Sequence, residues 1–180
     1  IGRARRCAGL NSGKSRPIEA STGIWIWAWP FRHFFWSLHM ALHEIIYVSL
    51  ATHEMKQAEL LALLDQARVH NEAHGITGLL MYHRHEFLQL LEGERDEVEA
   101  LYATICRDPR HQQVYAMWEG PVQTLSFDHW AMGFVSPDEE ALRERPGYEG
   151  VLSDGLVSAG KGSNGKKILL QLRDDFLRSV

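Results

Sequence analysis

The feature that most constrains the fold of this chain is the order in which its apolar residues change period between Leu42 and Val135. Side chains of a strand alternate between two faces, whereas those of a helix repeat about every 3.6 residues. Alternating or continuous apolar runs predict strands over 43–50, 76–82, 87–93, 114–118 and 130–135. Helical spacing of the apolar residues predicts helices over 55–71 and 94–107. The predicted order is therefore β-α-β-β-α-β-β.

This order predicts an α+β fold, namely a ferredoxin-like βαββαββ sheet. Because crossover connections between parallel strands are right-handed, both helices should lie on one face of the sheet. Near the end of the chain, apolar residues at helical spacing predict an amphipathic helix over 167–177, and an acidic helix is predicted over 138–145. We expect the C-terminal helices to pack on the other face of the sheet.

The first 39 residues differ in composition from the rest of the chain. Four of the six tryptophans lie there, and the first methionine is Met40. Three interpretations remain open: an extension that is absent from the natural protein, a disordered arm, or an interfacial aromatic anchor. We therefore divide the chain into an extension (1–39), a globular domain (40–136) and a C-terminal helical segment (137–180).

Charge and cysteine content limit the possible partners and the compartment. Residues 1–39 hold six basic residues and one acidic residue (+5), so the remainder has 13 basic and 22 acidic residues (−9). Such an acidic body argues against a nucleic-acid-binding face, and no apolar run is suited to spanning a membrane. Cys7 and Cys106 are too few and too far apart for a disulfide framework, which favours a cytoplasmic protein. The ten histidines show no metal-ligand spacing, so no metal is expected.

One residue breaks the apolar pattern of the third strand. Gln89 shares a face with Phe87 and Leu91, and a buried amide without partners costs about 1–3 kcal/mol. Tyr47 on the first strand and Asn71 near the end of the first helix point toward the same space. These three side chains can form a satisfied polar network in the core. Alternatively, they can hold a flat heterocycle with carbonyl and N–H edges between the helices and the sheet.

Several motifs occur in the order and spacing of the BLUF (blue light using flavin) family. They are Tyr47-Val48-Ser49, Asn71 followed by Gly75–Tyr82, Phe87–Gly93, Arg107–His111 and Trp130–Phe134. Over about 42–136 the chain resembles this family, and its length resembles the short members with only two C-terminal helices. An output enzyme would need a further domain, which the 45 residues after Val135 cannot hold. We therefore do not expect an enzyme.

The resemblance implies that FAD binds between the two helices and assigns a role to each matching residue. Asn71 would hydrogen-bond the carbonyl and N–H edge of the pyrimidine ring, and Gln89 would reach N5 and the neighbouring carbonyl. Tyr47 would hydrogen-bond Gln89. The positions near the ring rim, ribityl chain or phosphates are His70, Asp108, Arg110 and His111. Pro109 stands where many members have a basic residue, so we expect one phosphate contact fewer.

The resemblance further implies a blue-light photoreceptor. Excited flavin would take an electron from Tyr47, the proton would follow through Gln89, and the amide would end rotated, tautomerised, or both. The signal would leave through the fifth strand, where Trp130 and Met132 can exchange places beside Gln89, and through the terminal helices.

We expect the signal to reach a downstream signalling protein and the chain to form a homo-oligomer, with neither nucleic acid nor membrane as a partner. Two other functions are possible. A flavin-free ferredoxin-like sensor or interaction module would keep the fold and use the polar residues structurally. A flavin enzyme is disfavoured because Gln89 and Met132 would crowd the reactive position of the ring.

Overall fold

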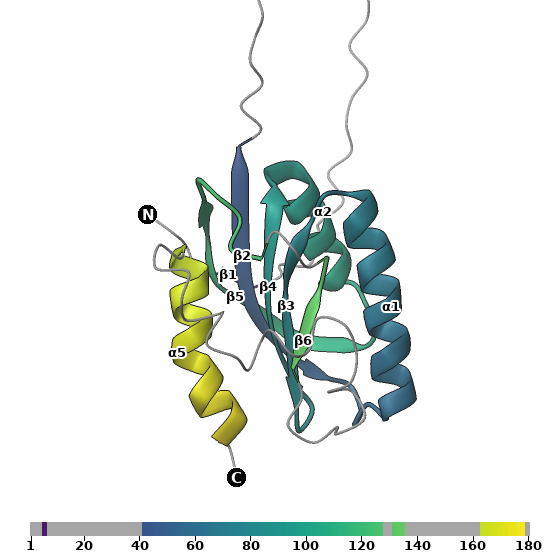
Figure 1. Ribbon diagram of the computed structural model, residues 1–180. Helices are drawn as coiled ribbons and strands as arrows, with labels where there is room; N and C mark the ends of the chain where they lie inside the picture. Colours follow the sequence, from purple (N-terminus) through teal and green to yellow (C-terminus); the bar gives the residue numbers. More distant parts are fainter. Residues whose placement is uncertain (1–4, 7–40, 128–130, 136–162, 179–180) are drawn as a thin grey trace, which may run out of the picture. The chain divides into compact units, whose positions relative to one another are not determined.

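The computed structural model describes residues 5–6, 41–127, 131–135 and 163–178 (Figure 1). These residues belong to one compact unit. The acidic helix predicted over 138–145 and the side chain of Trp130 lie outside the described residues.

The described residues contain six strands and three helices. The strands are β1 (Arg5–Arg6), β2 (Leu42–Ala51), β3 (Thr77–His83), β4 (Glu86–Glu94), β5 (His111–Pro121) and β6 (Gly133–Val135). The helices are α1 (Gln57–Ala73), α2 (Arg95–Ile105) and α5 (Asn164–Arg178). Each helix and strand predicted within the described residues is present, with ends that differ by a few residues.

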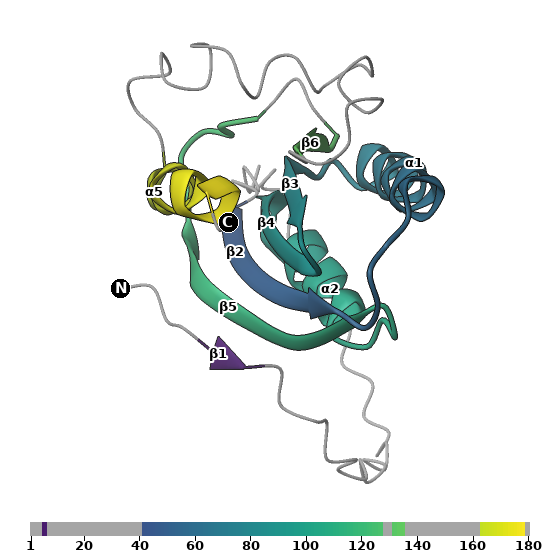
Figure 2. The ribbon, with the colours of Figure 1, turned by 90° about the horizontal axis from the view of Figure 1, so that it is seen from below.

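The strands form one sheet in the order β1-β5-β2-β4-β3-β6. The pairing is antiparallel throughout, except that β6 lies parallel to β3 at the edge. The inner order β5-β2-β4-β3 is the ferredoxin-like arrangement, so the predicted fold class is confirmed. Figure 2 shows α1 and α2 on one side of the sheet and α5 on the other, as the sequence predicts.

Alternation along the central strands divides the core into two apolar layers. Ile45 and Tyr47 of β2 join the layer packed against α1 and α2. Ile46 belongs to the opposite layer, which contains Leu169 of α5. Because the side-chain period is two, each central strand contributes to both layers and is buried on both faces.

Local capping sets the ends of α1. Lys56 is the N-cap, and its backbone N–H donates to the Glu59 carboxylate at 2.9 Å. The helix begins at Gln57, so the start predicted at residue 55 was slightly early. The helix ends before Gly75, whose φ of 61° requires the left-handed conformation that glycine adopts readily. This end places Asn71 in the last turn.

Two edge features differ from the sequence-based expectation. Strand β5 begins at His111 rather than Val114, because register shifts against β2 and a φ of 53° at Gln113 accommodate polar residues in the strand. Strand β6 begins only at Gly133, so Met132 precedes the strand instead of lying within it.

The N-terminal strand β1 was not predicted. Its two residues pair with β5, with Arg5 opposite Ala116 and Arg6 opposite Tyr115. An edge strand offers unpaired N–H and C=O groups, so even a short segment of suitable conformation can pair with it. This strand is part of the segment that the sequence analysis treats as an extension.

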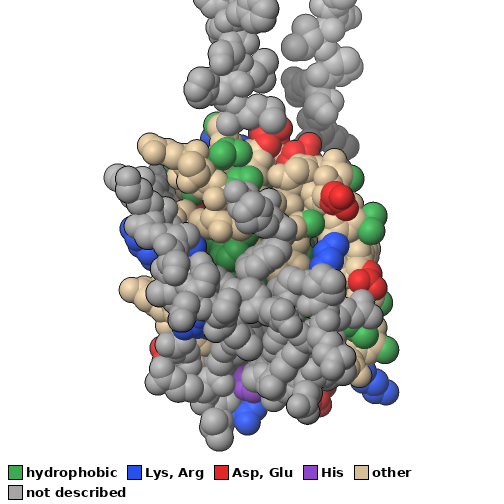
Figure 3. Space-filling view, viewed as in Figure 1, with side chains coloured by type: hydrophobic (Ala, Val, Ile, Leu, Met, Phe, Trp, Pro, Cys, Tyr) green, Lys and Arg blue, Asp and Glu red, His purple; other side chains and the backbone are tan. Residues whose placement is uncertain are grey.

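Other findings concern the cysteines, the membrane and the surface charge. Cys106 is disulfide-bonded, a bond that the cysteine content and spacing did not suggest. Within the described residues no helix is long and apolar enough to cross a bilayer. On the face shown in Figure 3, acidic and basic side chains lie in separate small groups.

Gly78 provides a test of the β3–β4 pairing. A Cβ atom added there would lie 2.0 Å from the backbone oxygen of Leu90, which the sheet holds in place. We expect Gly78→Ala to lower the free energy of unfolding by about 3 kcal/mol or more, measured by urea denaturation. Gly75→Ala is the control, since it meets no atom within 4 Å and strains only φ, at a cost of about 1 kcal/mol. Equal effects of the two substitutions would contradict this packing.

Candidate functional site

A cavity of about 190 Å³ lies between α1, α2 and the helix-facing side of the sheet. It is lined by all seven residues that the sequence analysis proposed for cofactor binding, namely Tyr47, His70, Asn71, Gln89, Asp108, Arg110 and His111. Apolar and small residues complete the walls, among them Leu63, Ala67, Leu80, Leu101 and Ile105. The fold thus brings together side chains from four strands, two helices and the turn that follows α2.

Tyr47 and Gln89 form the centre of the site. They are directly paired across β2 and β4, and the Tyr47 hydroxyl donates a hydrogen bond to Gln89 Oε1. Tyr47 is fully buried and Gln89 is 6% exposed. The Gln89 amide donates in turn to the sulfur of Met132, with an Nε2–Sδ distance of 3.3 Å. Gln89 therefore has different partners at its two chemically different ends.

Burial controls the protonation of Tyr47. Removal from water raises the pKa of its hydroxyl well above the usual value of 10, and the neighbouring Tyr102 and Asp108 add to this effect. Tyr47 therefore carries its proton at any physiological pH. Its ring centroid lies 5.6 Å from that of Tyr102 on α2, so the tyrosine is held between the sheet and the helix as a hydrogen-bond donor.

Asn71 presents an unused acceptor to the cavity. It is 1% exposed, and its Nδ2 donates to the backbone oxygen of Ala131 at 2.8 Å. Its Oδ1 is buried and has no hydrogen-bond partner among the described residues. An unpaired buried acceptor costs about 1–3 kcal/mol. A ligand with an N–H group at this position would remove that cost.

The segment before β6 is held against α1 by two side chains. In addition to the bond from Asn71, the Arg68 Nε donates to the backbone oxygen of Met132 at 3.1 Å. Met132 is 2% exposed and packs in the layer that faces the helices. Its sulfur therefore lies beside Gln89 although the residue precedes the strand.

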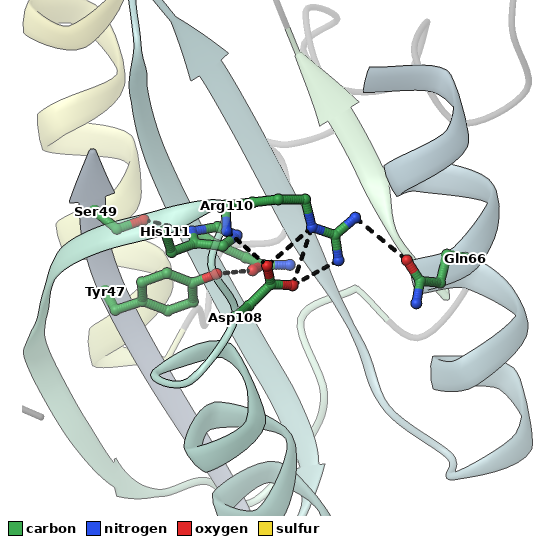
Figure 4. A network of polar contacts seen from close by, with 7 residues as sticks. Tyr47, Ser49, Gln66, Asp108, Arg110 and His111 are labelled. Atoms are coloured by element: carbon green, nitrogen blue, oxygen red, sulfur yellow. Dashed lines mark hydrogen bonds and ion pairs between the residues drawn. The ribbon is translucent and has the colours of Figure 1, made fainter. Parts of the chain in front are cut away.

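An ion pair lies at one side of the cavity (Figure 4). The guanidinium of Arg110 contacts both carboxylate oxygens of Asp108, with Nε at 3.0 Å from each. These hydrogen bonds hold the pKa of the Asp108 carboxyl below its usual range. Arg110 also donates to Gln66 Oε1 on α1 at 3.3 Å. Because Gln66 is exposed, this contact connects the turn after α2 to α1 near the surface.

His111 and His70 occupy different environments. His111 Nδ1 is hydrogen-bonded to Ser49 Oγ at 2.8 Å, and its ring lies 4.5 Å from that of Phe87. Burial lowers the pKa of His111 to about 4, so this ring is neutral at physiological pH. His70 is exposed at the rim of the cavity, where its ring lies 4.1 Å from that of His74.

Some residues of the site were not proposed from the sequence. Ser49 lies two residues after Tyr47 on the same strand face, and Gln66 lies one helical turn before His70, so periodicity could have indicated both. Arg68 and Ala131 could not be found in this way. Their contacts join a helix to a segment 60 or more residues away, and no local pattern encodes such a contact.

The size of the cavity suits a flat ring rather than a whole dinucleotide. Pockets for drug-sized ligands usually measure roughly 300–1,000 Å³, and this one holds about 190 Å³. The exposed Gln66 and His70 among its lining residues show that it reaches the surface. Any larger ligand would extend past these residues.

Comparison with known proteins identifies the family. The BLUF family, described as sensors of blue-light using FAD, matches residues 42–133. This chain belongs to the BLUF family. BLUF domains bind flavin, and the arrangement here fits that group, because Asn71 Oδ1 is a buried acceptor without a partner and the cavity suits a ring.

Similar BLUF proteins differ in length. The photoactivated adenylate cyclase subunit beta of Euglena longa is 35% identical over 113 residues, covering 62% of this chain but 13% of that protein. The dark-state structure of the BLUF protein BlrB is 27% identical, with a TM-score of 0.56 over 78% of this chain and 98% of that one. A Klebsiella pneumoniae BlrP1 complex with manganese and cyclic diGMP is 27% identical, with a TM-score of 0.59 over 74% and 33%.

The neutral state of His111 predicts a pH dependence of stability. Between about pH 6.5 and pH 4 the unfolded chain binds a proton at this residue that the folded chain does not. The free energy of unfolding therefore decreases as the pH falls through this window, by up to about 3 kcal/mol, and is fully retained above it. Urea denaturation at pH 7 and pH 4.5 measures the change, and His111→Gln should reduce it.

The control for His111 is His53→Gln, which replaces an exposed histidine and should keep the pH dependence of the unmodified chain. Comparing each variant with that chain cancels the contributions of the other titrating groups. If His111→Gln lost as much stability as the unmodified chain between the two pH values, His111 would not be buried in its neutral form.

Proposed function

We propose that this chain is a blue-light photoreceptor that binds FAD in the cavity and signals through a rearrangement of hydrogen bonds around Gln89. The observation that carries this proposal is the buried Gln89 amide, bonded to the Tyr47 hydroxyl at one end and to the Met132 sulfur at the other. Membership of a family of blue-light sensors supports it.

The lining residues suggest how FAD is held. The isoalloxazine ring takes the space between α1 and α2, with Asn71 Oδ1 accepting from its N–H edge and Gln89 reaching the opposite edge. The phosphates and adenine lie outside the cavity, where Arg110 keeps N–H groups that Asp108 and Gln66 do not use. His70, Asp108 and His111 surround the ring rim and the ribityl chain.

The chain's own residues can form two hydrogen-bonded states. Bound flavin supplies absorption of blue light and, when excited, oxidising power toward a nearby donor. Tyr47 would be that donor: its electron would pass to the flavin and its proton, through the bond to Gln89 Oε1, to the Gln89 amide, and both would return to Tyr47 on recombination, since burial disfavours a tyrosinate. While the Tyr47 oxygen lacks its proton, it can only accept a hydrogen bond. It therefore favours the NH₂ group of Gln89 as its partner in place of Oε1. Rotation or tautomerisation of the amide therefore becomes favourable during this step.

The change at Gln89 also alters the bond to Met132. The sulfur is a weak acceptor and pairs with the NH₂ end, whereas a carbonyl oxygen facing it forms no hydrogen bond. Met132 then loses one of the interactions that hold it, and Trp130 can take its place beside Gln89. This exchange moves the fifth strand of the domain, β6, and the C-terminal helices, which shifts the population of signalling states.

The output of the chain is a protein interaction rather than catalysis. The domain over 40–136 acts as the sensor, and the segment over 137–180 passes the change to a downstream signalling protein in the cytoplasm. The Euglena longa relative is a photoactivated adenylate cyclase subunit, so other members connect the same sensor to an effector. We further propose that the chain forms a homo-oligomer and that residues 1–39, apart from the strand β1 that pairs with β5, are an extension of the sensor domain.

Two substitutions test the photoactive pair. We expect Tyr47→Phe and Gln89→Leu to retain bound flavin but to lose the light-induced red shift of its absorption, because each removes one partner of the buried bond. The measurement is a visible spectrum before and after blue light, followed through dark recovery. Tyr102→Phe is the matched control, since it removes a hydroxyl from the tyrosine next to Tyr47 and should retain the shift.

Each outcome of this test is decisive. A normal red shift in Tyr47→Phe would exclude Tyr47 as the donor. If the unmodified chain shows a flavin spectrum that does not respond to light, the chain binds flavin but is not a photoreceptor. A purified chain that stays colourless with added FAD would favour the flavin-free sensor or interaction module.

The choice of FAD can be tested through Arg110. If Arg110 contacts a phosphate, Arg110→Gln should weaken the binding of FAD by about tenfold and leave that of riboflavin unchanged, since a charge-assisted bond contributes about 1.5–3 kcal/mol. Fluorescence titration of the flavin-free chain measures both dissociation constants. Arg107→Gln is the control, because Arg107 is exposed and does not line the cavity. Equal weakening for both ligands would show that Arg110 acts on the ring or on the fold.

A further inference from the structure

A second polar cluster lies on the opposite face of the sheet from the cavity, beneath α5. Glu44 on β2 and Glu92 on β4 are directly paired across the two strands, and they are 1% and 0% exposed. Lys166, in the first turn of α5, is 3% exposed. Like charges directly opposite each other in a sheet are unfavourable. Two buried carboxylates at this place therefore depend on specific hydrogen-bond partners.

Glu92 anchors the chain segment that leads toward β6. Its Oε2 accepts from the backbone N–H of Ser126 at 2.8 Å, and its Oε1 accepts from the backbone N–H of Phe127. The hydroxyl of Thr77 donates to Oε1 at 3.1 Å. Burial raises the pKa of Glu92, and these three donors oppose the effect by favouring the carboxylate. The carboxylate thus fixes the segment 126–127 on the sheet.

Glu44 anchors the start of α5. Its Oε1 accepts from the backbone N–H of Gly165 at 2.8 Å and from Nε1 of Trp118 at 3.1 Å. An acceptor here satisfies an N–H of the first helical turn that has no partner within the helix. A Cβ atom at residue 165 would lie 2.6 Å from Glu44 Oε2 and 2.7 Å from Leu90 Cδ1, both on buried side chains. Glycine therefore allows the helix to approach this closely.

The two anchored elements also contact each other. The Ser126 hydroxyl donates to Ser163 Oγ at 3.5 Å, just before α5. The ammonium of Lys166 lies 5.8 Å from the centroid of the Phe127 ring, which is a cation–π contact. The segment 126–127 and the first turn of α5 therefore form one connected cluster with the two glutamates.

A short piece of chain links this cluster to the cavity. Phe127 packs in the layer beneath α5, whereas Met132 packs in the layer beneath α1 and α2. The chain thus changes from one face of the sheet to the other within five residues, which span at most about 18 Å. Only a short stretch of chain therefore separates the two packed side chains, Phe127 and Met132.

We propose that the Glu44–Glu92 pair is a coupling element that joins the position of α5 to the position of Met132. Glu92 holds residues 126–127, five positions before Met132, and Glu44 holds the first turn of the helix. Both are positioning residues, since neither contacts the cavity. The proposal rests on the proposed function in one respect, namely that Met132 belongs to the set of residues that rearranges around Gln89. The coupling itself requires neither light nor flavin, and it is reciprocal.

The test uses the full chain in the dark, without flavin, with ¹³C-labelled methionine methyl groups observed by NMR. Gly165→Ala should displace the first turn of α5. We expect the methyl resonances of Met81, in the layer beneath α5, and of Met132 both to shift, while that of Met55, just before α1, stays unchanged. Lys167→Ala is the matched control, because Lys167 is exposed on the same turn, and it should shift none of them.

Two results would overturn the proposal. A shift of Met81 without a shift of Met132 would show that α5 moves independently of the switch segment. No shift of either would show that the close approach at Gly165 does not hold the helix. If Gly165→Ala does not fold, Glu44→Gln replaces it, since this substitution keeps the side-chain shape and removes the charge that holds the helix end. The same pair of resonances should then shift.

A second readout separates this proposal from the proposed function. In the flavin-loaded chain, Gly165→Ala should retain the light-induced red shift, since the substituted residue lies on the other face of the sheet. Suppose that the unmodified chain shows no red shift but that Gly165→Ala still shifts the Met132 resonance in the dark. The photoreceptor proposal would then be rejected and the coupling proposal retained. A normal red shift in the unmodified chain, with no change of the Met132 resonance in Gly165→Ala, would retain the photoreceptor proposal and reject the coupling.

Discussion

The site depends on one hydrogen bond between neighbouring strands, from Tyr47 to Gln89. The bond exists because the antiparallel register of β2 and β4 places these two residues directly opposite each other. A shift of one residue would turn Gln89 toward α5 and leave an apolar side chain facing the tyrosine. The packed layers on both faces of the sheet oppose such a shift, since every buried residue of the shifted strand would change sides. Packing of the whole sheet thus fixes the geometry of a single polar pair.

The same alternation gives the central strands two functions. On the face toward α1 and α2, Tyr47 and Gln89 line the cavity. On the opposite face, the same two strands carry the paired residues Glu44 and Glu92. A buried acidic pair weakens a sheet unless its hydrogen bonds are satisfied. Here, backbone N–H groups from α5 and from the segment before β6 donate to Glu44 Oε1 and to both oxygens of Glu92, while Glu44 Oε2 is buried without a partner among the described residues. The C-terminal helix is therefore attached through polar contacts as well as through its apolar face.

Much of the fold and of the site followed from local sequence patterns. Period-two alternation placed Tyr47 and Gln89 on the helix-facing side, and helical spacing placed Asn71 on the buried face of α1, as the structure confirms. The start of β5 was missed because His111, Gln112 and Gln113 are polar and one has a positive φ. The disulfide of Cys106 was missed because two distant cysteines give no local signal. Roles in flavin binding came from resemblance to the family rather than from spacing.

Between residues 42 and 135 the sequence by itself determined the order of helices and strands and the face on which the central side chains lie, because both follow from periodicities that are local in the chain. Only the tertiary structure decided which of these side chains meet. Three hydrogen bonds show this. Gln89 and Met132 are 43 positions apart in the chain, Asn71 and Ala131 are 60 apart, and Glu44 and Gly165 are 121 apart. Such contacts depend on how strands and helices pack, and packing is a property of the whole core.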